Sequence, residues 1–291
     1  MSRARRNAAA EDYLRRAPNY SAEAIRDLRR LSGREDIPKA AKVLGLAADL
    51  IESAHKFSLP DNGVLFGPLA DSMFDEVRLP FPKCVLEFGA VANEGAERPG
   101  IRCERRVVLC YEANGVCGCP VVSVLPISWS SSDERWVPAP FTVEIPMERR
   151  SDYSAAVVAI GEPGLKLFDR FGDDEAKKLA LTDSSLELQA VIEFSAAMSC
   201  TNVTTETLRP NREARAARPA STLFDYHVLM IEPGREHATS EDRGGSHASP
   251  RTHLRRGHIR RLAWGPRVWV NSCVVNPTAI GTVNKDYRVR P

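Results

Sequence analysis

The densest chemistry in the sequence is a run of arginines close to its carboxyl-terminal end. Seventeen consecutive residues without a single acid hold six of them, namely Arg251, Arg255, Arg256, Arg260, Arg261 and Arg267. An arginine guanidinium stays charged and presents a planar fork of N–H donors that matches a phosphate group. Neighbouring guanidiniums repel one another unless a polyanion, or an acidic surface of the same chain, neutralises them. The run therefore predicts a surface that binds phosphates.

Aromatic residues accompany this run and could add stacking contacts. Trp264, Trp269 and Tyr287 could stack on nucleic-acid bases if their rings are exposed. The plain alternative is that a tryptophan in a strand belongs to the protein core.

A second arginine segment lies some forty residues earlier, with Arg209, Arg212, Arg215 and Arg218 at every third position. Pro210 and Pro219 suit the two ends of a short helix. Steps of three residues drift by about 60° each on a helix, so the four side chains fan over one broad side. A solvated helix face is the alternative, but a second cluster in the same chain favours a joint phosphate-binding surface. The predicted nucleic-acid contacts are Arg209, Arg212, Arg215, Arg218, Arg255, Arg256, Arg260, Arg261 and Lys285.

Three of the six histidines, His247, His253 and His258, lie in the same carboxyl-terminal stretch. Imidazole titrates near neutral pH, so His253 and His258 could act as general acid and base on a phosphate held by Arg256 or Lys285. No acidic residue lies among these histidines, which disfavours a local metal site. The alternative is that the rings simply form part of the basic surface.

The seven cysteines predict neither a metal nor a cofactor. Cys103, Cys110, Cys117 and Cys119 lie within seventeen residues, but the gaps between them are six, six and one. Structural zinc sites favour pairs separated by roughly two to four residues. The basic first ten residues lack the apolar core of a secretory signal, so we expect reduced thiols in a cytoplasm. No run of about 18 apolar residues is present, so we expect no membrane partner.

The net charge of +2 hides a marked polarity along the chain. Residues 251–291 hold nine Lys and Arg against one acid, and residues 1–30 hold eight Arg against four acids, so the middle carries about −10. Such polarity suits a polyanion bound at one face. The alternative is that the basic ends dock on the acidic middle of the same chain.

The hydrophobic pattern predicts an α+β fold, with N-terminal helices, a mixed or antiparallel sheet with packed helices, and a C-terminal β-hairpin module. Residues 1–20 look loose, and helices are expected over 21–31, 38–57, 173–181 and 186–198. Strands are expected over 83–88, 105–111, 121–125, 141–145, 155–160 and 224–231. The final hairpin is expected to join 258–264 to 267–275 through a turn at Gly265-Pro266.

These elements predict four regions along the chain. They are a helical N-terminal region over 1–82, an α+β core over 83–231, a flexible loop over 232–250, and a basic C-terminal β module over 251–291 that packs on the core.

Several short motifs, in a fixed order, carry a family resemblance. They are C-T-N-V at 200–203, the arginine-rich segment to Pro219, F-D-Y-H-V-L-M-I at 224–231, H-x-x-R-G-H-x-R at 253–260, V-W-V at 268–270 and K-D-Y-R-V at 285–289. Together they resemble uncharacterised proteins encoded by tailed bacteriophages and prophages. The resemblance covers residues 200–289 and implies a phage setting. That family has no assigned activity, so it implies no mechanism.

The sequence therefore leaves three functions open. The first is a phage-encoded protein of the host cytoplasm that binds DNA or RNA, with weak sequence specificity, through its arginine-rich module. The second is a His-dependent nuclease or phosphotransfer enzyme that uses His253 and His258. The third is a host-targeting inhibitor or virion component whose partner is a host or phage protein. No phosphate-binding glycine loop or nucleophile elbow is present to favour an enzyme.

Overall fold

The structure is a computed structural model. It describes residues 3–34, 38–66, 71–75, 77–90, 105–116, 118–149, 155–218, 222–231, 253–255, 258–262, 265–270 and 273–275.

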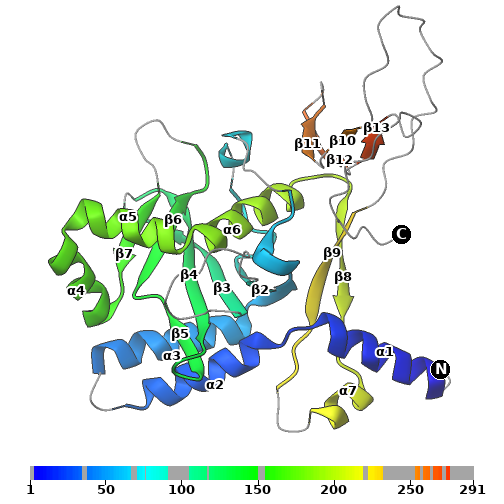
Figure 1. Ribbon diagram of the computed structural model, residues 1–291, viewed down its shortest axis with the longest axis horizontal. Helices are drawn as coiled ribbons and strands as arrows, with labels where there is room; N and C mark the ends of the chain where they lie inside the picture. The colour runs from blue at the N-terminus through cyan, green and yellow to red at the C-terminus, as the bar shows by residue number, and fades with distance from the viewer. Residues whose placement is uncertain are drawn as a thin grey trace, which may run out of the picture.

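A nine-stranded mixed sheet forms the centre of the molecule (Figure 1). Its strands are β1 (His55–Ser58), β2 (Lys83–Gly89), β3 (Arg105–Asn114), β4 (Pro120–Ser130), β5 (Arg135–Pro138), β6 (Phe141–Pro146), β7 (Ala156–Ala159), β8 (Val203–Leu208) and β9 (Tyr226–Ile231). The strand order is β7-β6-β4-β3-β2-β1-β9-β8, and β5 pairs with β4 outside that path. β1 is parallel to both of its neighbours, whereas the other pairs are antiparallel.

Helices cover both faces of this sheet (Figure 1). They are α1 (Arg3–Arg16), α2 (Tyr20–Ser32), α3 (Pro38–Ser53), α4 (Gly161–Phe171), α5 (Asp173–Asp183), α6 (Ser185–Met198) and α7 (Arg212–Ala217), with short 3-10 helices η1 (Asp61–Gly63) and η2 (Asp71–Phe74). α5 and α6 pack on one face, where Phe194 of α6 meets Phe57 of β1. α2 and α3 pack on the other face, where Leu28 and Ile51 lie against Trp136. Helices on both faces of a mixed sheet confirm the α+β fold class.

A buried carboxylate joins three of these elements. Glu87 of β2 is fully buried, and it accepts hydrogen bonds from the backbone N–H groups of Tyr20 and Ser21 at 2.8 and 3.0 Å. It also accepts hydrogen bonds from the Ser21 hydroxyl at 2.5 Å and the Tyr226 hydroxyl at 2.7 Å. The carboxylate therefore caps the start of α2, where backbone N–H groups lack helical partners.

Two predictions about the N-terminal region are wrong. Residues 1–20 look loose in sequence, but α1 forms there because Tyr13 buries its ring against Tyr226 and donates its hydroxyl to the Phe224 carbonyl at 2.6 Å. The helix expected over 38–57 ends at Ser53, and the next residues form β1. Phe57 is fully buried in this strand, so tertiary burial outweighs the helical pattern.

Two short strand pairs lie beyond the sheet. β10 (His253–Arg255) pairs with β13 (Cys273–Val275), and β11 (His258–Arg261) pairs with β12 (Arg267–Val270). Gly265 follows β11 with φ 103°, a conformation that favours glycine and suits the predicted turn. The predicted hairpin is thus confirmed for β11 and β12. Its second arm is expected to continue to residue 275, but β13, at the end of that range, pairs with β10 instead. Residues 232–250, predicted as a flexible loop, lie outside the described residues.

Candidate phosphate-binding site

The β11–β12 hairpin is held beside α6 and β8 by contacts to its backbone. The Asn202 side chain accepts a hydrogen bond from the Trp269 N–H at 2.7 Å and donates one to the Trp269 carbonyl at 2.9 Å. The Thr201 N–H donates to the Arg267 carbonyl at 3.0 Å, and Cys200 forms a parallel bridge with Arg267. These contacts fix the hairpin against the sheet at two neighbouring positions.

The Trp269 ring packs against Phe66, a residue that borders the core. Its centroid lies 4.1 Å from that of Phe66, and the residue is half-buried. Glu193 of α6, fully buried, holds this contact by accepting hydrogen bonds from the N–H groups of Leu65 and Phe66 at 2.5 and 2.7 Å. Trp269 therefore anchors the hairpin through its contact with Phe66, and its ring is only partly exposed.

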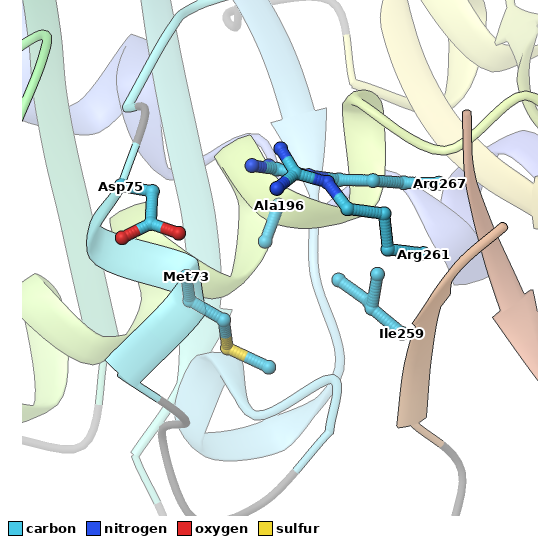
Figure 2. A pocket seen from close by; sticks show the side chains of 6 residues that line it. All are labelled: Met73, Asp75, Ala196, Ile259, Arg261 and Arg267. Carbon is cyan, nitrogen blue, oxygen red and sulfur yellow. The ribbon is translucent and has the colours of Figure 1, made fainter. Parts of the chain in front are cut away.

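Arg261 and Arg267 point into one small pocket beside α6 (Figure 2). The two residues are register partners across the β11–β12 pair. The pocket has a volume of about 60 Å³. The other residues that line it are Met73, Asp75, Ala196 and Ile259. Like charges directly opposite one another on paired strands are destabilising, so the arrangement favours a small anion between the guanidiniums.

No described carboxylate neutralises either guanidinium. Arg267 donates a long hydrogen bond of 3.4 Å to the Ser199 hydroxyl, and Arg261 forms no ion pair within the described ranges. Asp75 also lines the pocket (Figure 2). Its carboxylate pairs with Arg149 at 3.4 Å. The pocket therefore carries a net positive charge.

Arginines elsewhere in the described structure commonly have acidic partners. Such pairs join Arg16 to Asp12 and Glu206, Arg29 to Asp49 and Glu52, Arg78 to Glu148, Arg105 to Glu23, Arg106 to Glu187, and Arg149 to Asp75. The arginines of the β11–β12 hairpin differ in this respect, and Arg260 and Arg261 are exposed.

The second arginine segment forms α7 and its flanks. Asn211 caps this helix by accepting a hydrogen bond from the Ala214 N–H at 2.8 Å, and Ala214 buries against α1. Arg212 and Arg215 are exposed and form no ion pair with any described residue, whereas Arg209 pairs with Asp225 at 3.5 Å. The predicted short helix is confirmed.

The two arginine segments do not meet on one face. α7 follows the last residue of β8, whereas the hairpin contacts residues 200–202 just before its first residue. In Figure 1 they lie at opposite ends of the β8–β9 pair. The prediction that the two arginine segments form one continuous surface is therefore wrong for the described parts of both segments.

Several predicted site residues cannot be placed as side chains. The backbone puts His253 and Arg255 on β10 and His258 on β11, in two separate strand pairs, and their side chains lie outside what the structure describes. The remaining residues of this kind, which lie outside the described residues altogether, are Arg251, Arg256, Trp264, Lys285 and Tyr287. The proposed acid–base role of the two histidines stays a prediction.

A different pair of histidines meets in the structure. The Nδ1 atom of His55 lies 3.3 Å from the Nε2 atom of His227, beside a pocket of about 320 Å³. Burial, and then the nearby His55, lower the pKa of His227. Sequence reasoning missed this pair because 172 residues separate its members. The sequence signals only that His227 lies in an apolar strand, because β1, which reads H-K-F-S, holds a single apolar residue.

Lys56, on the opposite side of β1, has a structural role. Its ammonium donates to the carbonyls of Glu52 and Ala54 at 2.7 and 2.8 Å and lies over the Phe224 ring. Burial lowers the pKa of this lysine to about 8. The side chain thus satisfies carbonyls that the end of α3 leaves without helical partners.

The described cysteines do not form a metal centre. Cys84, Cys110 and Cys200 are buried free thiols, and burial raises the pKa of each. Cys119 is disulfide-bonded, so the expectation of reduced thiols is wrong at this position. No group of three or more His, Cys, Asp or Glu side chains within the described ranges converges on one point.

Comparison with protein-family models, curated proteins and solved structures finds no match to this chain. Among the described residues, no helix has the length and apolar character needed to cross a membrane.

Proposed function

We propose that this protein binds nucleic acid through phosphate contacts made by the β11–β12 hairpin. The observation that carries the proposal is the opposed pair of Arg261 and Arg267, which share one small pocket without a described carboxylate partner. A phosphate oxygen between two guanidinium forks would relieve their repulsion and accept several charge-assisted hydrogen bonds. Arg260 lies next to Arg261 on the same strand, so its exposed side chain points to the other face of the hairpin and is not part of this pocket.

Such contacts position a nucleic acid but do not read its sequence. Binding is therefore expected to be weakly specific for sequence and to weaken steeply with salt, because each phosphate contact releases counterions. We also propose that the protein is phage-encoded, as its resemblance to phage and prophage proteins implies, and that it acts in the host cytoplasm. Binding measurements with both DNA and RNA decide between these two ligands.

Fluorescence anisotropy with labelled DNA and RNA, at several salt concentrations, tests the proposal. We expect the Arg261→Gln/Arg267→Gln double variant to weaken binding and to reduce the slope of log affinity against log salt by about 1, because the two arginines share one phosphate. Arg29→Gln is the matched control, because Arg29 is exposed but paired with Glu52 at 2.6 Å. Affinity that is unchanged by salt, or equal losses in both variants, would refute the proposal.

A further inference from the structure

The His55–His227 pair lies at the starts of two parallel strands, far from the arginine pocket. β1 and β9 are neighbours in register, with Phe57 opposite His227. Nδ1 of His55 and Nε2 of His227 face each other at 3.3 Å. Each ring thus turns one nitrogen toward the other ring.

Neighbouring side chains hold both rings in place. The His55 ring stacks on Phe81 at a centroid distance of 3.7 Å and an interplanar angle of 11°. The His227 ring lies 5.0 Å from that of Phe57, and its other nitrogen, Nδ1, lies 3.4 Å from the Thr207 hydroxyl. A polar group on the second nitrogen is a common feature of metal-binding histidines, because it fixes the ring's orientation.

We propose that His55 and His227 bind a divalent late transition-metal ion through Nδ1 and Nε2. Metal–nitrogen bonds of about 2.0–2.1 Å at a tetrahedral angle place two ligand nitrogens about 3.3–3.4 Å apart. The observed separation of 3.3 Å matches that edge. A single hydrogen bond between the rings explains the same distance, so the experiment must separate the two arrangements.

The surroundings fit an open site with two protein ligands. The adjoining pocket of about 320 Å³ has room for water ligands. Asp225 and Arg209 also line it, but they pair with each other at 3.5 Å, and no described side chain provides a third ligand.

The ligand type determines which ions should bind. Imidazole ligands bind Cu²⁺ more tightly than Zn²⁺ or Ni²⁺, whereas the tetrahedral separation of the two nitrogens suits Zn²⁺ best. Mg²⁺ prefers oxygen ligands and should not compete. The site is separate from the β11–β12 hairpin, so failure of metal binding and failure of nucleic-acid binding would be seen in different variants.

Calorimetric titration of the full chain with Cu²⁺ and Zn²⁺, and electron paramagnetic resonance of the Cu²⁺ form, test the proposal. We expect one ion per chain, nitrogen hyperfine coupling, and at least a tenfold loss of affinity in His55→Gln and in His227→Gln. The control is the His253→Gln/His258→Gln double variant, which removes two of the three histidines of the C-terminal stretch and should bind normally. Circular dichroism and urea unfolding would show that each variant is folded.

A substitution outside the two ligands tests the site with less risk that the variant fails to fold. Thr207→Val removes the hydroxyl beside His227 and should weaken metal binding by roughly ten- to a hundredfold while both ligands remain. Absence of binding by the wild-type chain would overturn the proposal and leave the rings as a hydrogen-bonded pair. Binding that survives His227→Gln but is lost in the C-terminal double variant would also overturn it.

Discussion

At the scale of single residues, Glu87 carries the largest concentration of buried polar contacts. Four donors from α2 and β9 surround its carboxylate, and no part of the side chain reaches solvent. A buried acceptor that loses an oxygen leaves donors without partners, which costs more than the net value of the hydrogen bonds.

We therefore expect Glu87→Gln to lower the free energy of unfolding by about 1–3 kcal/mol, because an amide N–H₂ group would face a backbone N–H. Urea unfolding followed by circular dichroism measures the change. Glu11→Gln is the control, since Glu11 is exposed and should change stability by less than about 0.5 kcal/mol. Equal stability of the two variants would contradict the role assigned to Glu87.

The same carboxyl predicts a pH dependence. Burial raises the pKa of Glu87, so the folded protein holds this proton more tightly than the unfolded chain does. Its contribution to stability is fully present below about pH 4.3, the ordinary glutamate value, and is lost as the pH rises through the folded-state pKa. The difference in unfolding free energy between wild type and Glu87→Gln should therefore narrow as the pH rises. A difference that widens would contradict the raised pKa.

The residue scale also shows what sequence can and cannot predict about the site. Exposed Arg212, Arg215, Arg260 and Arg261 follow from a charge that burial would penalise, so their accessibility is readable from composition. The contact between His55 and His227 cannot be predicted from the sequence, because it depends on β1 and β9 becoming neighbours.

At the scale of elements, the β11–β12 hairpin depends on one amide side chain. Asn202 satisfies both backbone groups of Trp269, as a neighbouring strand would. We expect Asn202→Ala to speed hydrogen exchange in residues 267–270 by roughly tenfold, equivalent to about 1.4 kcal/mol of local stability. Hydrogen exchange with mass spectrometry measures this effect.

The matched control for that variant is Asn211→Ala. It removes the cap of α7 and should cost about 1 kcal/mol, with faster exchange confined to residues 212–217. If Asn202→Ala leaves residues 267–270 protected, the hairpin is held by other contacts.

Elements with a strong local pattern are predictable from sequence. α6 and the β11–β12 hairpin follow from apolar periodicity and from a glycine turn. α1 and β1 cannot be predicted in this way, because each is stabilised by partners distant in sequence. The partner of α1 is Tyr226, and those of β1 are its two flanking strands. Local propensity carries no information on such partners.

At the scale of the whole molecule, the two arginine clusters are separated by the length of β8. Six residues at about 3.3 Å each span about 20 Å. A duplex rises about 3.4 Å per base pair, so about six base pairs are needed to reach from one cluster to the other.

The separation predicts a dependence on ligand length. Arg212→Gln/Arg215→Gln should weaken binding of a duplex of about 20 base pairs but not of one of about five, whereas Arg261→Gln/Arg267→Gln should weaken both. Fluorescence anisotropy with both lengths measures this. Equal effects of the two double variants on the short duplex would contradict the spatial separation of the clusters.

The central place of β1 has a consequence for synthesis on the ribosome. This strand leaves the ribosome early, yet one of its two edges is covered only when residues 226–228 arrive. Until then the nascent chain presents an open β edge, which is a template for pairing with other chains. Loss of the first 58 residues would divide the sheet into two unconnected halves, so a shortened chain that begins after β1 should aggregate instead of folding.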